Sequence, residues 1–156
     1  MSDVMTPEQR LAEQGLTVPD VVRPVAAYVP AVRTGSLVYT AGQVPKRGDS
    51  YLYTGKVGAE VSVDQAVECA RQCALNALAA LKGELGELSR VQRIVKVVVF
   101  VASTPDFTGQ PAVANGASEL LGDAFGEAGR HARSAVGVAV LPLDVPVEVE
   151  LIAEVA

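Results

Sequence analysis

Residues 62–102 predict a long amphipathic helix followed by an almost purely apolar strand. Ser62-Val63-Asp64-Gln65 has the form of a capping box, which marks the start of a helix. Apolar residues then recur with the helical period, at positions 63, 66, 67, 70, 73, 74, 77, 78, 81 and 85, and Gly83 and Gly86 mark the end. Residues 94–102 are nearly all apolar and β-branched, which indicates a strand covered on both faces. A chain with these two elements is expected to pack helices on a sheet.

Further strands are predicted on both sides of this pair. The strand candidates are residues 27–32, 37–41, 51–54, 132–140 and 147–155, and a second helical pattern covers residues 106–125. The order along the chain is therefore β-β-β-α-β-α-β-β. This order predicts an α+β fold, in which a single mixed sheet carries two main helices on one face. The other face of such a sheet must meet water or another subunit.

The N-terminal residues form a separate segment. Thr6-Pro7-Glu8-Gln9 has the pattern of a helix start, and Gly15 ends this helix. Residues 1–22 are expected to be a helical extension and linker, and residues 23–156 the α+β domain. The extension lacks the basic and apolar regions of a secretory signal, and no apolar stretch is long enough to span a membrane. These features predict a cytoplasmic location.

Composition argues against several classes of function. The net charge is −5 and Lys and Arg form no cluster, which disfavours a nucleic-acid surface. The only histidine, His131, and two cysteines supply few ligands for zinc, and no nucleotide-binding glycine loop is present. Cys69 and Cys73 lie four apart in the predicted helix, so they are expected to be free thiols in a reducing compartment.

The C-terminal strands combine regular alternation with one unexpected arginine. Residues 147–155 alternate between an apolar side and a side rich in glutamate. On the preceding strand, Arg133 shares its side with the small residues Ala135, Gly137 and Ala139. These neighbours leave room for a guanidinium to bind a carboxylate through two parallel hydrogen bonds.

The residues alone allow two different carboxylates as the partner of Arg133. A direct hairpin centred on residues 141–146 would place Arg133 opposite Glu154, as a structural salt bridge. Alternatively, Arg133 is the receptor for a small organic acid, with Glu148 nearby to handle protons or water. His131 lies on the same side of the strand and is interpreted as a surface residue, although a hydrolytic triad would have to use it.

Several motifs together resemble one protein family over residues 21–156. They are Arg133-Ser134 with Leu141-Pro142, then Val147-Glu148-Val149-Glu150, the segment Tyr39-Thr40-Ala41-Gly42-Gln43-Val44-Pro45, and the single residues Tyr28 and Asn115. In this combination the chain resembles the Rid/YjgF family, whose RidA branch comprises enamine and imine deaminases.

The resemblance implies an architecture and a reaction. It implies a chorismate-mutase-like α+β fold that assembles as a homotrimer, with clefts between subunits. It also implies hydrolysis of reactive enamines and imines, such as 2-aminoacrylate, to 2-keto acids and ammonia, with no metal or organic cofactor. The implied partner is therefore a small carboxylate substrate, with neither a membrane nor a nucleic acid involved.

The resemblance also implies a role for each matching residue. Arg133 would bind the substrate carboxylate, and Glu148 would position or activate the attacking water. The backbone of Gly42 would lie near the substrate nitrogen. Tyr28 and Asn115 would line the cleft.

Some positions depart from the family pattern. Ala135, also placed in the substrate site, stands where many RidA members have Cys, so thiol chemistry is lost there. Ala26-Ala27 replaces a Gly-Pro pair, residues 109–111 are inserted, and the N-terminal helix is additional. We therefore expect a divergent branch. Two alternatives stay open, a non-catalytic carboxylate-binding or chaperone-like trimer and, less favoured, an endoribonuclease.

Overall fold

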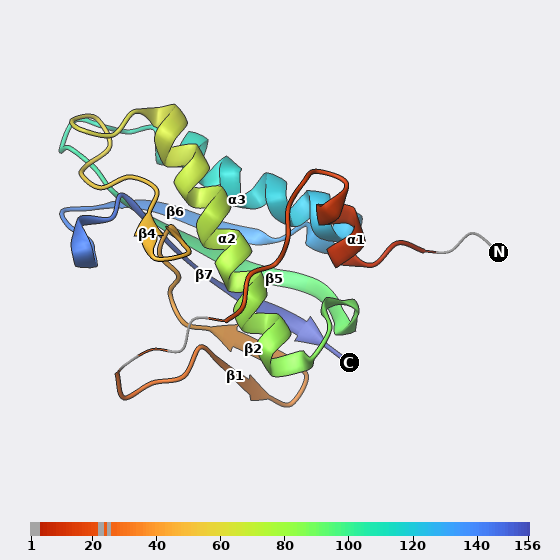
Figure 1. Ribbon diagram of the computed structural model, residues 1–156. Helices are drawn as coiled ribbons and strands as arrows, with labels where there is room; N and C mark the ends of the chain where they lie inside the picture. Colours follow the sequence, from red (N-terminus) through yellow and green to blue (C-terminus); the bar gives the residue numbers. More distant parts are fainter. Residues whose placement is uncertain (1–3, 22–23, 25) are drawn as a thin grey trace.

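The computed structural model, which describes residues 4–21, 24 and 26–156, places two long helices on one face of a five-stranded sheet (Figure 1). The elements are α1 (Pro7–Ala12), β1 (Ala31–Thr34), β2 (Leu37–Thr40), β3 (Lys46–Arg47), β4 (Ser50–Tyr51), α2 (Val63–Leu85), η1 (Leu88–Arg90), β5 (Val91–Ala102), α3 (Gln110–Phe125), η2 (Gly126–Gly129), β6 (Ala132–Val138), η3 (Pro142–Asp144) and β7 (Val147–Val155). The predicted α+β class is confirmed. The expected domain boundary between residues 22 and 23 lies outside the described residues.

Two expected strands differ in extent from those in the structure. The first begins at Ala31 and not at residue 27, although the hairpin with β2 forms as predicted. The weak strand expected at residues 51–54 is instead the second half of a short hairpin, in which β3 and β4 make a separate small sheet.

The strand order in the main sheet is β1-β2-β7-β5-β6. β7 runs antiparallel to β2 and β5, and β6 runs parallel to β5 at the edge. The direct hairpin between the last two strands is therefore wrong, because β5 lies between them. Glu154 pairs in register with Leu37 and Arg93 and not with Arg133. This order gives β5, the longest and most apolar strand, a hydrogen-bonded neighbour on each side.

The two long helices pack closely against each other and against the sheet. α2 starts as predicted, because the Ser62 side chain accepts from the Gln65 amide while the Gln65 side chain accepts from the Ser62 amide. Gly116 of α3 lies against the Val67 carbonyl of α2, where a Cβ would overlap that oxygen. Neither these helices nor any other within the described ranges combines the length and apolarity needed to cross a membrane.

The two faces of the sheet differ in character. The face under the helices is built from fully buried aliphatic side chains, among them Val97, Val99, Val101, Val147, Val149 and Leu151. The opposite face carries half-buried or exposed residues, namely Tyr39, Val98, Phe100, Glu148, Glu150 and Ile152. The prediction that β5 is covered on both faces is therefore wrong for the single chain. Helices cover one face, and the described residues leave the other open.

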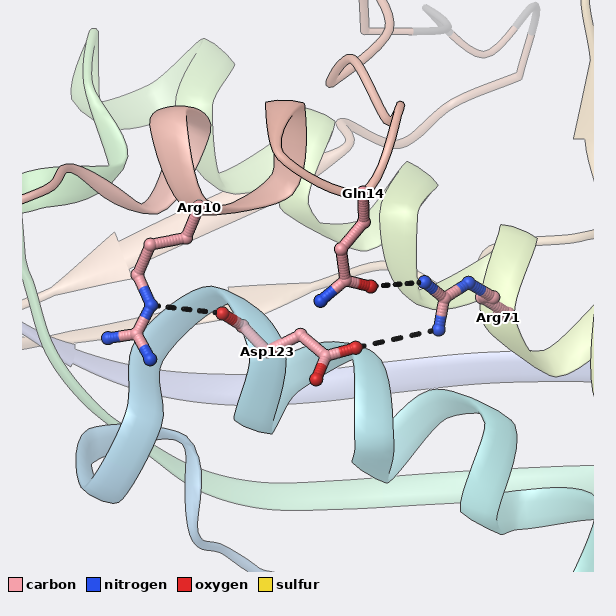
Figure 2. A network of polar contacts seen from close by, with 4 residues as sticks. All are labelled: Arg10, Gln14, Arg71 and Asp123. Atoms are coloured by element: carbon pink, nitrogen blue, oxygen red, sulfur yellow. Dashed lines mark hydrogen bonds and ion pairs between the residues drawn. The ribbon is translucent and has the colours of Figure 1, made fainter.

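The N-terminal helix α1 is an integral part of the helical layer. Leu11 is fully buried. Arg10 Nε donates to the main-chain oxygen of Asp123 at 3.1 Å, at the end of α3. The Asp123 carboxylate lies 3.7 Å from Nη1 of Arg71 on α2, and Nη2 of Arg71 donates to Gln14 at 2.9 Å (Figure 2). These contacts tie α1 to both long helices.

We expect Leu11→Ala to lower the free energy of unfolding by about 2 to 5 kcal/mol, because it leaves a cavity under α1. Val4→Ala is the matched control, since residue Val4 is 90% exposed. Urea denaturation followed by circular dichroism measures both. A loss of less than about 0.5 kcal/mol in Leu11→Ala, the range of ordinary surface changes, would show that α1 is a dispensable appendage.

Candidate functional site

Arg133 lies on the edge strand β6 and faces α3. Its Nη1 donates to Oδ1 of Asn115 at 2.8 Å and to Oγ of Ser118 at 3.1 Å. Its Nη2 donates to the carbonyl oxygen of Pro111 at 3.4 Å. All three acceptors are neutral and belong to α3. The helix therefore fixes the direction of the guanidinium without neutralising its charge.

The guanidinium of Arg133 remains able to bind an anion. It makes no ion pair with any acid in residues 4–21, 24 and 26–156. A guanidinium has five N–H groups, and the bonds to α3 use both hydrogens of Nη1 and one of Nη2. Nε–H and the second Nη2–H have no partner in the same described part of the chain. A pair of neighbouring N–H groups matches the two oxygens of a carboxylate.

Small residues follow Arg133 on the same face of β6, as the sequence alternation predicts. Ala135 and Gly137 lie on the same face of β6, opposite Val99 and Val101 of β5. A Cβ at position 137 would come within 2.7 Å of Nε2 of Gln110, the first residue of α3. Small side chains therefore let α3 lie close over β6.

A shallow hollow of about 290 Å³ opens beside Arg133. Its lining includes Ser118 and His131. Nε2 of His131 lies 2.9 Å from Oγ of Ser118, and Nδ1 lies 2.7 Å from the carbonyl oxygen of Gly129. His131 is thus more than the surface residue that the sequence suggested, because it belongs to the hydrogen-bonded group around Arg133.

Glu148 lies on the open face of the sheet, in β7. Gly42 passes so close that a Cβ there would lie 2.7 Å from Oε1 of Glu148. Burial raises the pKa of the Glu148 carboxyl above its ordinary value of 4.5, and the negative charge of Glu150 raises it further. A raised pKa brings a carboxyl closer to neutral pH, where it can both accept and release a proton.

Gly42 connects Glu148 to a second predicted residue. It borders a small hollow of about 100 Å³ whose lining includes Tyr28. The next residue, Gln43, exchanges main-chain hydrogen bonds with Val149 at 2.8 and 2.9 Å, which holds this segment beside β7. Gly42 therefore lies beside Glu148 and also borders the hollow that Tyr28 lines.

The predicted site residues fall into two groups that one copy of the chain keeps apart. Arg133, Asn115 and Ala135 lie on the helix side at β6, whereas Gly42 and Glu148 lie together at β7, with Tyr28 in the hollow that Gly42 borders. The two strands are separated by β5, a lateral distance of about 10 Å. Within a single copy, the guanidinium and the carboxylate do not face one cleft.

Sequence reasoning missed two acceptors of the Arg133 guanidinium. Ser118 follows Asn115 by three positions on α3, and residues at this spacing share one side of a helix. That spacing could have indicated Ser118. The carbonyl oxygen of Pro111 carries no signal in the sequence, because every residue has one.

Metal and thiol chemistry find little support in the described residues. No three His, Cys, Asp or Glu side chains gather there in a way that could hold a metal ion. Burial raises the pKa of Cys69 to about 12, and burial raises that of Cys73 well above its ordinary value. Both cysteines are free thiols, as predicted, and their raised pKa values keep them from acting as nucleophiles.

Residues 8–155 match the family model described as "YjgF/chorismate mutase-like, putative endoribonuclease". The chain belongs to the YjgF family. The protein TCP17 of Trypanosoma cruzi is 44% identical over 145 residues, which cover 92% of this chain and 91% of that protein. The family resemblance seen in the sequence motifs is thereby confirmed.

Solved structures also share the YjgF-family fold. The crystal structure of Atu1372 from Agrobacterium tumefaciens, described as of unknown function, is 44% identical with a TM-score of 0.91, and the match covers 96% of this chain and 92% of that chain. E. coli TdcF, solved with bound serine, is 27% identical with a TM-score of 0.62, and the match covers 87% and 94% of the two chains.

Proposed function

We propose that the protein hydrolyses imines and enamines derived from 2-amino acids, and releases 2-keto acids and ammonia. The observation that carries this proposal is the Arg133 guanidinium, which is oriented by neutral acceptors and has two N–H groups left for a carboxylate. The serine in TdcF is a small amino acid with the same carboxylate, and it supports this class of ligand.

The chemistry requires orientation, a water molecule and proton transfer. Arg133 binds the carboxylate, which places the neighbouring C=N carbon in the cleft. Glu148 takes a proton from water as the water oxygen bonds to that carbon, and passes this proton to the imine nitrogen, which gives a carbinolamine. Glu148 then takes the hydroxyl proton of the carbinolamine and passes it to the nitrogen as the C–N bond breaks, so that the products are a keto acid and ammonia. An enamine first takes a proton on its carbon and becomes the imine.

The proposal includes a site between copies of the chain. Arg133 and Glu148 lie on opposite faces of one sheet, so they can meet at one substrate only if a second copy supplies one of them. The open face, with Tyr39, Phe100 and Ile152, offers apolar area for such an assembly. A homotrimer with three equivalent clefts, as the resemblance implies, satisfies this requirement with a single repeated interface.

The test uses imines that an amino-acid oxidase generates in the cuvette from several amino acids. The protein should accelerate the conversion of the imine to the keto acid, measured in competition with semicarbazide, which traps imines. Imines made by an amine oxidase from amines without a carboxylate are the matched control and should not be accelerated. No acceleration for any amino-acid-derived imine would contradict the proposal. If the protein binds keto acids but accelerates the hydrolysis of no imine, the non-catalytic alternative is favoured.

A further inference from the structure

The hydrogen bonds around His131 have a defined direction. A carbonyl oxygen can only accept, so Nδ1, at 2.7 Å from the Gly129 oxygen, carries a hydrogen. In the neutral imidazole, Nε2 is then an acceptor, and the Ser118 hydroxyl at 2.9 Å donates to it. The lone pairs of Ser118 Oγ are left for Nη1 of Arg133 at 3.1 Å. Gly129, His131, Ser118 and Arg133 therefore form one consistent chain.

We propose that His131 is a positioning residue, which acts through Ser118 to hold the Arg133 guanidinium in the orientation that receives a carboxylate. The inference rests on the proposed function, since it concerns the capture of that substrate. It assigns to the single histidine a role in ligand binding that involves no contact with the reacting atoms. His131 is itself fixed by η2, through the Gly129 carbonyl.

The hydroxyl of Ser118 explains why the histidine is needed. A hydroxyl rotates freely to suit its surroundings. Without an acceptor at Nε2, the hydroxyl hydrogen of Ser118 loses its partner, and the side chain can turn about its Cα–Cβ bond to reach the carbonyl one turn before it in the helix. That rotation moves the oxygen as well as the hydrogen, so Nη1 of Arg133 loses its bond to Ser118, and the guanidinium keeps only the bonds to Asn115 and to the Pro111 carbonyl.

Kinetic analysis of single variants measures this effect. His131→Leu and Ser118→Ala should each raise KM for the imine about tenfold, with kcat within about twofold, because they weaken ground-state binding of the carboxylate. His131→Gln keeps an acceptor near the position of Nε2 and should stay within about threefold of the wild-type KM. The double variant His131→Leu/Ser118→Ala should be no worse than Ser118→Ala, because both changes break one chain. Arg33→Leu is the control, since Arg33 is exposed in β1, outside this hollow, and its Nε donates to the carbonyl oxygen of Gly35.

A second readout needs no catalysis. The Nη1 hydrogens of Arg133 bond to Asn115 and Ser118, and their resonance, identified by its loss in Arg133→Lys, should be sharp at low temperature in the wild type, in His131→Gln and in Arg33→Leu. It should broaden in His131→Leu and in Ser118→Ala. An unchanged resonance in His131→Leu would overturn the inference, whatever the enzyme assays show. A broadened resonance in a protein that hydrolyses no imine would support the positioning role and reject the proposed function.

Discussion

Replacing Arg133 with alanine is expected to lower kcat/KM for imine hydrolysis by about 10²- to 10³-fold, because the substrate carboxylate loses two charge-assisted hydrogen bonds. The fold should survive, since Arg133 bonds only neutral acceptors and no buried acid depends on it. We expect the free energy of unfolding to stay within about 1 kcal/mol of the wild-type value. Steady-state kinetics and urea denaturation on the same preparation measure both quantities.

Lysine at position 133 is expected to restore little of this activity. It keeps the positive charge but cannot bond two carboxylate oxygens in parallel, and it cannot satisfy three acceptors on α3 while doing so. Arg33→Ala removes an exposed charge on β1, outside the hollow beside Arg133, and should leave the rate unchanged. Full activity in Arg133→Lys would show that charge alone suffices, and full activity in Arg133→Ala would reject carboxylate capture by this residue.

Replacing Glu148 with glutamine is expected to lower kcat by about 10²-fold or more, because the side chain can no longer accept a proton from water. KM should change little, since the carboxylate of the substrate is bound by Arg133.

The same substitution of Glu148 by glutamine should raise the melting temperature at neutral pH. Burial and Glu150 disfavour the ionised carboxylate of Glu148, and a neutral amide of nearly equal shape avoids that cost.

The pH dependence of this stabilisation has a definite sign. The folded chain holds the Glu148 proton more tightly than the unfolded chain, so the wild type loses stability as pH rises from 4.5 through the raised pKa of the folded state. The glutamine variant has no such loss at this position. Its advantage in melting temperature should be complete at neutral pH and should shrink as pH falls towards 4.5. Equal melting temperatures of the wild type and the glutamine variant at neutral pH would contradict an energetic cost of ionising Glu148. Full activity of the glutamine variant would contradict the role of Glu148 as proton acceptor.

Local patterns determine much of the fold, and the sequence reveals them. The capping box at Ser62 and the helical period of α2 are read directly from residue types. The alternation along β7 correctly separates its buried side from its acidic side. The small residues Ala135 and Gly137 lie on the same face of β6 as Arg133, as the alternation predicts.

The arrangement of strands in space was harder to predict. Neighbours in sequence usually pair, and this tendency suggested a hairpin of β6 with β7. In the structure β5 separates them, because its long apolar segment gains partners on both edges. The register pairs Arg133 with Val97 on the helix face and Glu148 with Phe100 on the other face, which no local pattern reveals. The acceptors of Arg133 on α3 likewise depend on how that helix lies over β6.

In the trimer that we propose, Arg133 of one copy and Glu148 of another act on one substrate. Mixing the two inactive variants, Arg133→Ala and Glu148→Gln, tests it directly. The variants carry different affinity tags and are unfolded and refolded together, so that mixed oligomers can be purified through both tags. In a cyclic trimer every mixed assembly contains one cleft with both residues intact, so we expect roughly a third of the wild-type rate per mixed oligomer. Mixed oligomers as inactive as their parents would contradict a site that is shared between copies.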